Sequence, residues 1–206
     1  MSKSRKVILI DDETDLLKAL SRLLRAEGFD VETHERAATF LAAPRPEEPA
    51  CLVLDESMPG MTGSELHQHL AREQSHLAVV FLTARGDIPM SVRAMKTGAV
   101  DFLTKPVKDK ELIAVIRNAL EKSSALLEKN HELAELRSRH DRLTSREREV
   151  LGHVASGMPN KQIASLLGLV EQTIKVHRGR VMSKMGADSF AQLVLHAEKL
   201  GLIAAR

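Results

Sequence analysis

Short apolar runs alternate with amphipathic stretches over the first 120 residues of the chain. Three runs are continuous and apolar, as is typical of strands buried on both faces of a sheet, and they cover residues 7–10, 51–54 and 77–82. A fourth predicted strand covers residues 100–103, where Asp101 stands among apolar residues. Apolar residues at helical spacing, with glycine or proline at the turns, predict helices between and after these strands. The helices contain Leu16 to Leu24, Leu66 to Leu70, Met90 to Thr97 and Glu111 to Leu120. This alternation predicts a parallel sheet covered by helices on both faces.

A long stretch without breaks follows these elements. Residues 107–142 contain neither glycine nor proline and are rich in Leu, Glu and Lys, which predicts one long helix. An apolar position recurs every seven residues, as along the seam of a coiled coil, at Leu112, Ala119, Leu126 and Leu133. Two interpretations remain open, namely a dimerising coiled coil and a solvated helix that connects two domains.

From Leu143 onward the pattern is entirely helical. Thr144, with Glu147 three residues later, forms a capping box that predicts a helix start. Four helices are predicted, each ending near a glycine, where helix C-termini favour that residue. They cover residues 145–156, 160–168, 171–185 and 189–200.

The composition narrows the possible functions. The chain has 206 residues, enough for two small domains, and 43% of them are hydrophobic, so a core can form. Aromatic residues make up only 2%, which argues against a nucleic-acid binder that stacks bases on exposed rings. The single cysteine, Cys51, cannot form an internal disulfide or a zinc cluster and suits a reducing compartment. Without a signal-like segment or an apolar run of membrane-spanning length, we expect a cytoplasmic protein that does not contact membranes.

Charge is divided unevenly along the chain. Residues 1–140 carry 20 Lys and Arg against 22 Asp and Glu, whereas residues 141–206 carry 10 against 6. A basic C-terminal third indicates a nucleic-acid-binding module, although solvated helices often carry the same excess.

Polar side chains of complementary chemistry stand at the ends of the four predicted strands, and they are Asp11 with Asp12, Asp55, Thr83 and Lys105. Because the carboxyl ends of parallel strands meet at one edge of a sheet, we expect these side chains to converge. Clustered carboxylates favour Mg²⁺, and a carboxylate can be the nucleophile of phosphoryl transfer with a lysine as the second cation. Taken singly, each residue has an ordinary alternative role as a helix cap, a strand former or a solvated lysine.

The motifs around these residues resemble those of response-regulator receiver domains over about residues 5–122. They are Ile10-Asp11-Asp12-Glu13, Leu54-Asp55 with Met58-Pro59-Gly60 and Gly63, Leu82-Thr83-Ala84, and Asp101-Phe102-Leu103-Thr104-Lys105-Pro106. The resemblance implies an α/β doubly wound fold with a five-stranded parallel sheet, of the flavodoxin-like kind.

The same resemblance implies a role for each residue of the site. Asp55 would be the phosphoacceptor, and Thr83 and Lys105 would contact the phosphoryl group. Thr83 and Phe102 would form a switch pair, in which the hydroxyl moves toward the phosphate and the ring turns inward. Mg²⁺, or Mn²⁺ in its place, would be bound by Asp12, Asp55 and the carbonyl of Ser57, with Asp11 acting through a metal-bound water.

Glu56 departs from the receiver pattern, in which an apolar residue is expected after the phosphoacceptor. On a strand its side chain would point away from Asp55, yet its negative charge would remain nearby. We therefore expect phosphorylation to be modestly slowed, or the metal affinity to be altered, relative to a Glu56→Val variant.

Residues 160–185 predict a helix, a short glycine turn and a second helix. On the second helix Ile174, Val181 and Met185 share an apolar face, and the opposite face is small and basic. Such a helix can enter the major groove of DNA, although a packed bundle with a solvated basic face has the same periodicity. The stretch nevertheless resembles the LuxR-type helix-turn-helix over about residues 142–204. The residues that carry this resemblance are Leu143 to Leu151, Gly157, Asn160 to Ala164, Leu167-Gly168, and Thr173 to His177 with Lys184-Met185.

The LuxR-type resemblance implies a set of DNA contacts, with Lys175 and Val176 reaching base edges. The full set is Lys161, Gln172, Thr173, Lys175, Val176, His177 and Arg180. Val170 stands where a serine usually caps the recognition helix, and Gly179 stands where a longer polar residue or a small residue often reads DNA. Each is expected to lower the stability of this helix by about 1 kcal/mol.

The whole chain is similar to FixJ-type two-component response regulators, and its long linker resembles the branch that controls aromatic-hydrocarbon catabolism. We predict a receiver domain at residues 1–122, a helical linker at 123–141 and an all-α four-helix DNA-binding domain at 142–206. A sensor histidine kinase would phosphorylate Asp55, and the switch would control binding to promoter DNA. Further expectations are a homodimer when phosphorylated and contact with RNA polymerase. We expect no enzymatic activity beyond Mg²⁺-dependent self-phosphorylation and slow self-dephosphorylation.

Two other functions fit parts of the pattern. In a metal-dependent phosphatase of the aspartyl-phosphate type, a second acid would lie two residues after Asp55, but Ser57 occupies that position. In a constitutive DNA-binding protein the receiver would be vestigial, which the complete residue set argues against.

Overall fold

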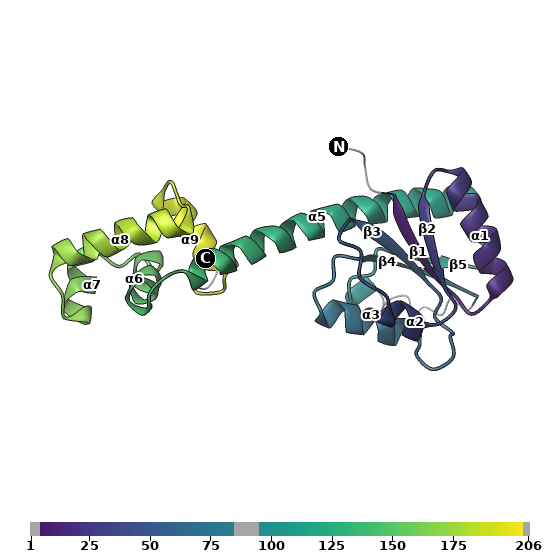
Figure 1. Ribbon diagram of the computed structural model, residues 1–206, viewed down its shortest axis with the longest axis horizontal. Coiled ribbons are helices and arrows are strands. Elements are labelled where there is room, and N and C mark those ends of the chain that lie inside the picture. The colour runs from purple at the N-terminus through teal and green to yellow at the C-terminus, as the bar shows by residue number, and fades with distance from the viewer. Residues whose placement is uncertain (1–4, 85–94, 204–206) are drawn as a thin grey trace. The chain divides into compact units, whose positions relative to one another are not determined.

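The computed structural model describes residues 5–84 and 95–203. The chain forms two compact units, the N-terminal unit (residues 1–128) and the C-terminal unit (residues 129–206), whose elements are labelled in Figure 1. The helix predicted from Met90 to Thr97 lies mostly outside the described residues.

The N-terminal unit is built on a five-stranded parallel sheet with the strand order β2-β1-β3-β4-β5. The strands are β1 (Lys6–Ile10), β2 (Asp30–His34), β3 (Ala50–Leu54), β4 (Ala78–Thr83) and β5 (Asp101–Thr104). The strand order reverses between β1 and β3, and in such sheets ligands bind at the carboxyl ends of the two strands that flank this point. The predicted doubly wound, flavodoxin-like fold is therefore confirmed.

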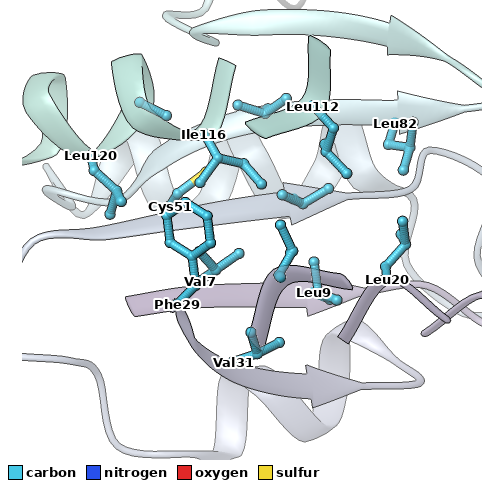
Figure 2. Packing of buried hydrophobic residues seen from close by; sticks show 14 of the residues in the cluster. Val7, Leu9, Leu20, Phe29, Val31, Cys51, Leu82, Leu112, Ile116 and Leu120 are labelled. Carbon is cyan, nitrogen blue, oxygen red and sulfur yellow. The ribbon is translucent and has the colours of Figure 1, made fainter. Parts of the chain in front are cut away.

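Helices cover both faces of this sheet because successive strand residues point to opposite sides. On one face Val7 and Leu9 pack with apolar residues of α1 (Thr14–Ala26) and of the first turns of α5 (Asp109–Asp141), as Figure 2 shows. On the other face Ile8 and Ile10 pack with residues of α2 (Ala37–Ala42) and α3 (Gly63–Arg72). The N-terminal unit thus has two mainly aliphatic cores, one on each side of the sheet.

The four strands predicted from the sequence correspond to β1, β3, β4 and β5, but β2 has no apolar run that would predict it. This strand lies at the edge of the sheet and pairs with β1. Among its residues only Val31 is fully buried. An edge strand with one solvated side needs few apolar residues, so hydrophobic pattern alone did not reveal it.

The long helix predicted over residues 107–142 is present as α5, which has 33 residues. Leu112 and Ala119, two positions of the seven-residue repeat, are fully buried in the core of the N-terminal unit. The helix is also tied to β3, because the backbone N–H of Ala50 donates to the buried Oγ of Ser123 at 2.9 Å. Of the repeat, Leu126 is 42% exposed and Leu133 is partly buried, so the apolar seam available to a partner helix is short.

The C-terminal unit contains the four predicted helices around one aliphatic core. They are α6 (Ser145–Ala155), α7 (Asn160–Leu167), α8 (Glu171–Met185) and α9 (Phe190–Lys199). The capping box at the start of α6 is confirmed, because Thr144 Oγ1 accepts from the Glu147 amide at 3.2 Å and Glu147 Oε2 accepts from the Thr144 amide at 2.8 Å. Leu136 and Leu143, which precede α6, also pack into this core.

None of the helices in the described part of the chain combines the length and the apolar character needed to cross a lipid bilayer.

Candidate functional site

The carboxyl edge of the sheet brings together the side chains that follow β1, β3 and β5. The ammonium of Lys105 lies 2.6 Å from Asp11 Oδ2, 3.1 Å from Asp55 Oδ1 and 3.0 Å from Glu13 Oε1. The side chains of Asp11 and Asp55 are only 5% and 6% exposed, and that of Lys105 is 14% exposed. Three carboxylates therefore share one lysine at the point where the strand order reverses.

Burial and charge act in opposite directions in this cluster. Burial raises the pKa of Asp11 above its ordinary value, even though Lys105 stabilises the ionised form. Partial burial opposes the charge of Lys105, but hydrogen bonds to Asp11, Glu13 and Asp55 outweigh it and raise the pKa of the ammonium. The lysine is thus charged at neutral pH, and it is shared by three acidic side chains, an arrangement that a further cation would favour.

The backbone holds Asp55 in a defined orientation. Its amide donates to the carbonyl of Ile10 at the end of β1, at 2.9 Å, which ties the end of β3 to its neighbour. Its carboxylate Oδ2 accepts from the backbone N–H of Ser57 at 2.7 Å, while Oδ1 faces Lys105. One oxygen is therefore oriented by the loop after β3 and the other by the lysine.

Two residues predicted for the metal site lie at the rim of this cluster. Asp12 and Ser57 are exposed, next to the buried Asp11 and Asp55. Among the described residues, no group of three or more His, Cys, Asp or Glu side chains is arranged to hold a metal ion by itself. Glu13 belongs to the first motif, but its contact with Lys105 was not foreseen, because the sequence does not show which side the first residue after Asp12 faces.

The predicted switch residues lie on neighbouring strands. Thr83 is 1% exposed at the end of β4, and its carbonyl accepts from the Lys105 amide at 2.8 Å. Phe102, on β5, is partly buried and pairs in register with Phe81, whose ring centroid is 6.3 Å from its own. Phe81 in turn contacts the ring of the buried His67 edge to face, at 5.6 Å between centroids.

The side chain of Glu56 is directed to the start of α3. Its Oε2 accepts from the backbone N–H and from the hydroxyl of Ser64, each at 2.9 Å. The charge of Glu56 is therefore engaged by two donors. The sequence could not reveal this pairing, because the two residues are eight positions apart across an irregular loop.

In the C-terminal unit α8 has the two faces that its sequence predicts. Ile174, Val181 and Met185 are fully buried, with 0% exposure. The opposite side is exposed, and it contains Gln172, Lys175, Val176, Gly179 and Arg180, while Lys161 is exposed on α7. Thr173 and His177 are only partly buried, and Nδ1 of His177 is buried without a hydrogen-bond partner among the described residues.

The two residues at the start and in the middle of α8 that depart from the LuxR-type pattern, Val170 and Gly179, are both exposed. Val170 is the N-cap of α8, in an extended conformation, and its side chain is 67% exposed and provides no capping hydrogen bond. Gly179 is exposed, and a Cβ added there would meet no atom within 4 Å. Neither position is therefore required by packing to keep its residue.

Two basic residues of the C-terminal unit have structural contacts that sequence reasoning did not assign. Arg178 donates to Asn160 Oδ1 at 3.3 Å and lies over the ring of Phe190, 5.2 Å from its centroid, so it joins α7, α8 and α9. Lys184 donates to the buried carboxylate of Glu147 at 2.6 Å and joins α8 to the cap of α6. Helical periodicity alone does not separate such residues from those predicted to contact DNA.

Comparison with known families and proteins covers both units. A family model described as the response regulator receiver domain matches residues 7–117, and one described as bacterial regulatory proteins of the luxR family matches residues 141–197. Nodulation protein W of Bradyrhizobium diazoefficiens is 41% identical over 198 residues, which cover 96% of this chain and 87% of that protein. The transcriptional regulatory protein FixJ of Azorhizobium caulinodans is 40% identical, with 98% and 96% of the two chains covered. The response regulator protein TodT of Pseudomonas putida is 39% identical, with 97% and 88% covered.

Solved structures give the same result. The response regulator StyR is 43% identical, with a TM-score of 0.74 and coverage of 94% of this chain and 98% of that one. Full-length FixJ from B. japonicum is 35% identical, with a TM-score of 0.58 and coverage of 98% and 100%. Because both family models match and the relatives align over almost the whole length, the chain belongs to the response regulators, and it joins a receiver domain to a LuxR-type DNA-binding domain.

Proposed function

We propose that Asp55 accepts a phosphoryl group from a sensor histidine kinase and that this transfer controls the binding of promoter DNA by the C-terminal unit. The observation that supports it best is the lysine shared by Asp11 and Asp55 at the carboxyl edge of the sheet. The buried, oriented carboxylate of Asp55 provides the nucleophile, and the neighbouring lysine provides a positive charge for the phosphoryl oxygens.

In the proposed transfer a carboxylate oxygen of Asp55 forms a bond to phosphorus, while the bond from phosphorus to the imidazole nitrogen of the kinase breaks. The electron pair of that bond leaves with the nitrogen. Lys105 then moves its contact from the Asp55 carboxylate to a phosphoryl oxygen, and the hydroxyl of Thr83 donates to another. Water then slowly hydrolyses the acyl phosphate, which releases inorganic phosphate and restores the Asp55 carboxylate. This hydrolysis is the self-dephosphorylation expected from the sequence.

The donor set fits Mg²⁺, or Mn²⁺ in its place. A small divalent cation in proteins usually has one or two carboxylate ligands and keeps several waters, so it needs no cage of three acidic side chains. Asp11 and Asp55 already lie within 3.1 Å of one cationic group, the Lys105 ammonium. The residues that would hold the ion are Asp12, Asp55 and the Ser57 carbonyl, with Asp11 acting through water, and the ion would neutralise charge on the phosphoryl oxygens.

The proposed output depends on two further steps. The hydroxyl of Thr83 and the ring of Phe102 shift the receiver between two conformations, and the altered surface favours a homodimer. The exposed side of α8 then enters the major groove, where Lys175 and Val176 reach base edges. The other proposed DNA contacts are Lys161, Gln172, Thr173, His177 and Arg180, and contact with RNA polymerase follows at the promoter.

We further propose the functional limits 1–122 for the receiver, 123–141 for the linker and 142–206 for the DNA-binding domain, in a cytoplasmic protein. Packing extends across these limits, since Leu136 belongs to the core of the C-terminal unit. The functional limits therefore describe which residues act, not which residues each unit needs in order to fold.

The test uses the full chain with acetyl phosphate and Mg²⁺, and mass spectrometry detects the phosphoryl group. We expect one phosphoryl group on the wild type and none on Asp55→Asn. No label on the wild type would refute the proposal, and continuous release of phosphate at high turnover would instead indicate a phosphatase.

The proposed control of DNA binding is tested by measuring DNA affinity before and after labelling. Equal affinities would show a constitutive DNA-binding protein.

A further inference from the structure

The loop after β3 folds back so that α3 begins directly against Asp55. The backbone N–H of Gly63 donates to the carbonyl of Glu56 at 3.1 Å. A Cβ added at Gly63 would overlap the carbonyl oxygen of Asp55 and lie 3.1 Å from Phe81 Cε1. Glycine is therefore required at this close approach, where the start of α3 lies against the backbone of Asp55.

This same loop contains the atoms that the proposed reaction needs. The Ser57 amide orients Asp55 Oδ2 at 2.7 Å, and the Ser57 carbonyl is the proposed metal ligand. The next residue, Met58, is 6% exposed and packs in the core on the α3 side of the sheet. The geometry of the acceptor thus depends on how firmly the loop is closed at its far end.

Glu56 closes that end with its side chain. Its Oε2 accepts from both the amide and the hydroxyl of Ser64, each at 2.9 Å. The following backbone amide of α3, that of Glu65, donates to the Thr62 hydroxyl as part of a capping box. Each of the first three amides of α3 therefore has an acceptor, and Glu56 provides two of these acceptors, one from its backbone and one from its side chain.

The position of the Glu56 charge also matters. A carboxylate at a helix N-terminus is stabilised by the helix dipole, and here it has two hydrogen-bond donors as well. Glu56 Oε2 is directed to the first turn of α3. This arrangement gives a reason for an acidic residue at a position where the receiver pattern has an apolar one.

We propose that Glu56 is a positioning residue for the acceptor site, which clamps the loop after β3 to α3 and so fixes the Asp55 carboxylate and the Ser57 backbone. The inference rests on the proposed function of Asp55 as phosphoacceptor. It predicts the opposite of a simple charge effect, because removing Glu56 loosens the site and does not relieve repulsion.

The experiment compares the full-length wild type with Glu56→Val, Glu56→Gln and Ser64→Ala. The Mg²⁺ concentration for half-maximal acetyl-phosphate labelling is measured, together with the hydrogen-exchange rate of the Ser57 amide. We expect Glu56→Val to need about 10-fold more Mg²⁺, the size of effect typical for residues that orient metal ligands, and to exchange the Ser57 amide faster. Glu56→Gln keeps an acceptor for Ser64 and should restore most of both properties, while Ser64→Ala, which keeps its amide, should lie between.

Global unfolding in urea serves as the control, because a purely structural role would lower stability without changing the Mg²⁺ dependence. Wild-type values of both readouts in Glu56→Val, or faster labelling in that variant, would overturn the inference while leaving Asp55 as acceptor. If the wild type itself is not labelled, the proposed function fails, and the Ser57 amide still reports whether Glu56 holds the loop.

Discussion

Each unit of the molecule contains a buried carboxylate bonded to a lysine, and the two pairs differ in what surrounds them. In the C-terminal unit the Glu147 side chain is 3% exposed, and its Oε2 accepts from the Lys184 ammonium at 2.6 Å and from the Thr144 amide at 2.8 Å. In the N-terminal unit Lys105 is shared by Asp11, Asp55 and Glu13. One lysine satisfies one acid in the first case, and three acids compete for one lysine in the second.

The pKa directions reflect this difference. The Lys184 hydrogen bond and the Thr144 amide lower the pKa of Glu147 to about 2, whereas burial raises the pKa of Asp11 above its ordinary value. In the C-terminal unit one lysine neutralises one acid, which is the arrangement of a structural ion pair. A cluster with more acids than cations favours a further cation, and this excess distinguishes the candidate chemical site from a structural ion pair.

The largest expected effect comes from removing the shared lysine. Lys105→Met should lower the rate of acetyl-phosphate labelling by about 100-fold, because the positive charge next to the phosphoryl oxygens is lost. The matched control is Lys184→Met, which removes the other lysine and should label like the wild type. Equal labelling of Lys105→Met and wild type would show that the lysine has no part in the transfer.

Lys184→Met, which is expected to leave labelling unchanged, should instead lower the stability of the C-terminal unit. Lys184→Met leaves Glu147 buried without its cationic partner and should destabilise the C-terminal unit by about 2 kcal/mol, less than for a fully buried pair because Lys184 is 36% exposed. Urea unfolding, together with amide exchange in α6 and α8, measures this loss. Unchanged protection of both helices would mean that the pair contributes nothing to the fold.

Acid should weaken the C-terminal unit through the same pair. The pKa of Glu147 is lowered from 4.5 to about 2 on folding, so its contribution to stability is complete above pH 4.5. As pH falls from there toward 2, the unfolded chain takes up a proton that the folded state excludes, and the contribution is lost. The difference in urea midpoint between wild type and Glu147→Gln should shrink over this range, whereas a constant difference would contradict the assignment.

The smallest effect concerns the N-cap of α8, which has no side-chain hydrogen bond. Val170→Ser should stabilise the C-terminal unit by about 1 kcal/mol by supplying an acceptor for the first turn. Val170→Ala is the control, since it removes the exposed apolar side chain without adding an acceptor. Thermal unfolding of the two variants measures the gain, and equal melting temperatures would show that the first turn is already satisfied.

The sequence was sufficient for features that depend on local pattern, and it failed where contacts join distant residues. The apolar runs of β1 and β3, the heptad-spaced α5 and the Thr144 capping box all follow from short-range periodicity or spacing. The edge strand β2 has no apolar run, because only one side of it is buried. Convergence at the carboxyl edge was predictable from strand order, since the register of parallel strands brings their ends together.

Contacts made by long polar side chains were not predictable. Glu13 reaches Lys105 across 92 positions of sequence, and Glu56 reaches Ser64 around an irregular loop. Arg178 is a basic residue on the predicted recognition helix, a type of residue that often contacts DNA, but its side chain lies over the ring of Phe190. In each case rotamers and loop geometry decide the partner, and a sequence pattern contains neither.

The length of α5 has a practical consequence for dividing the protein. Leu112 to Ser123 complete the core of one unit, while Leu136 and Arg139, whose guanidinium donates to the Met185 carbonyl at 3.1 Å, belong to the other. A receiver fragment that ends before Ser123 leaves the Ala50 amide unpaired, and a DNA-binding fragment that starts at residue 142 loses a core leucine. Chimaeras with other response regulators should therefore be joined between residues 124 and 131, where α5 contributes least to either core.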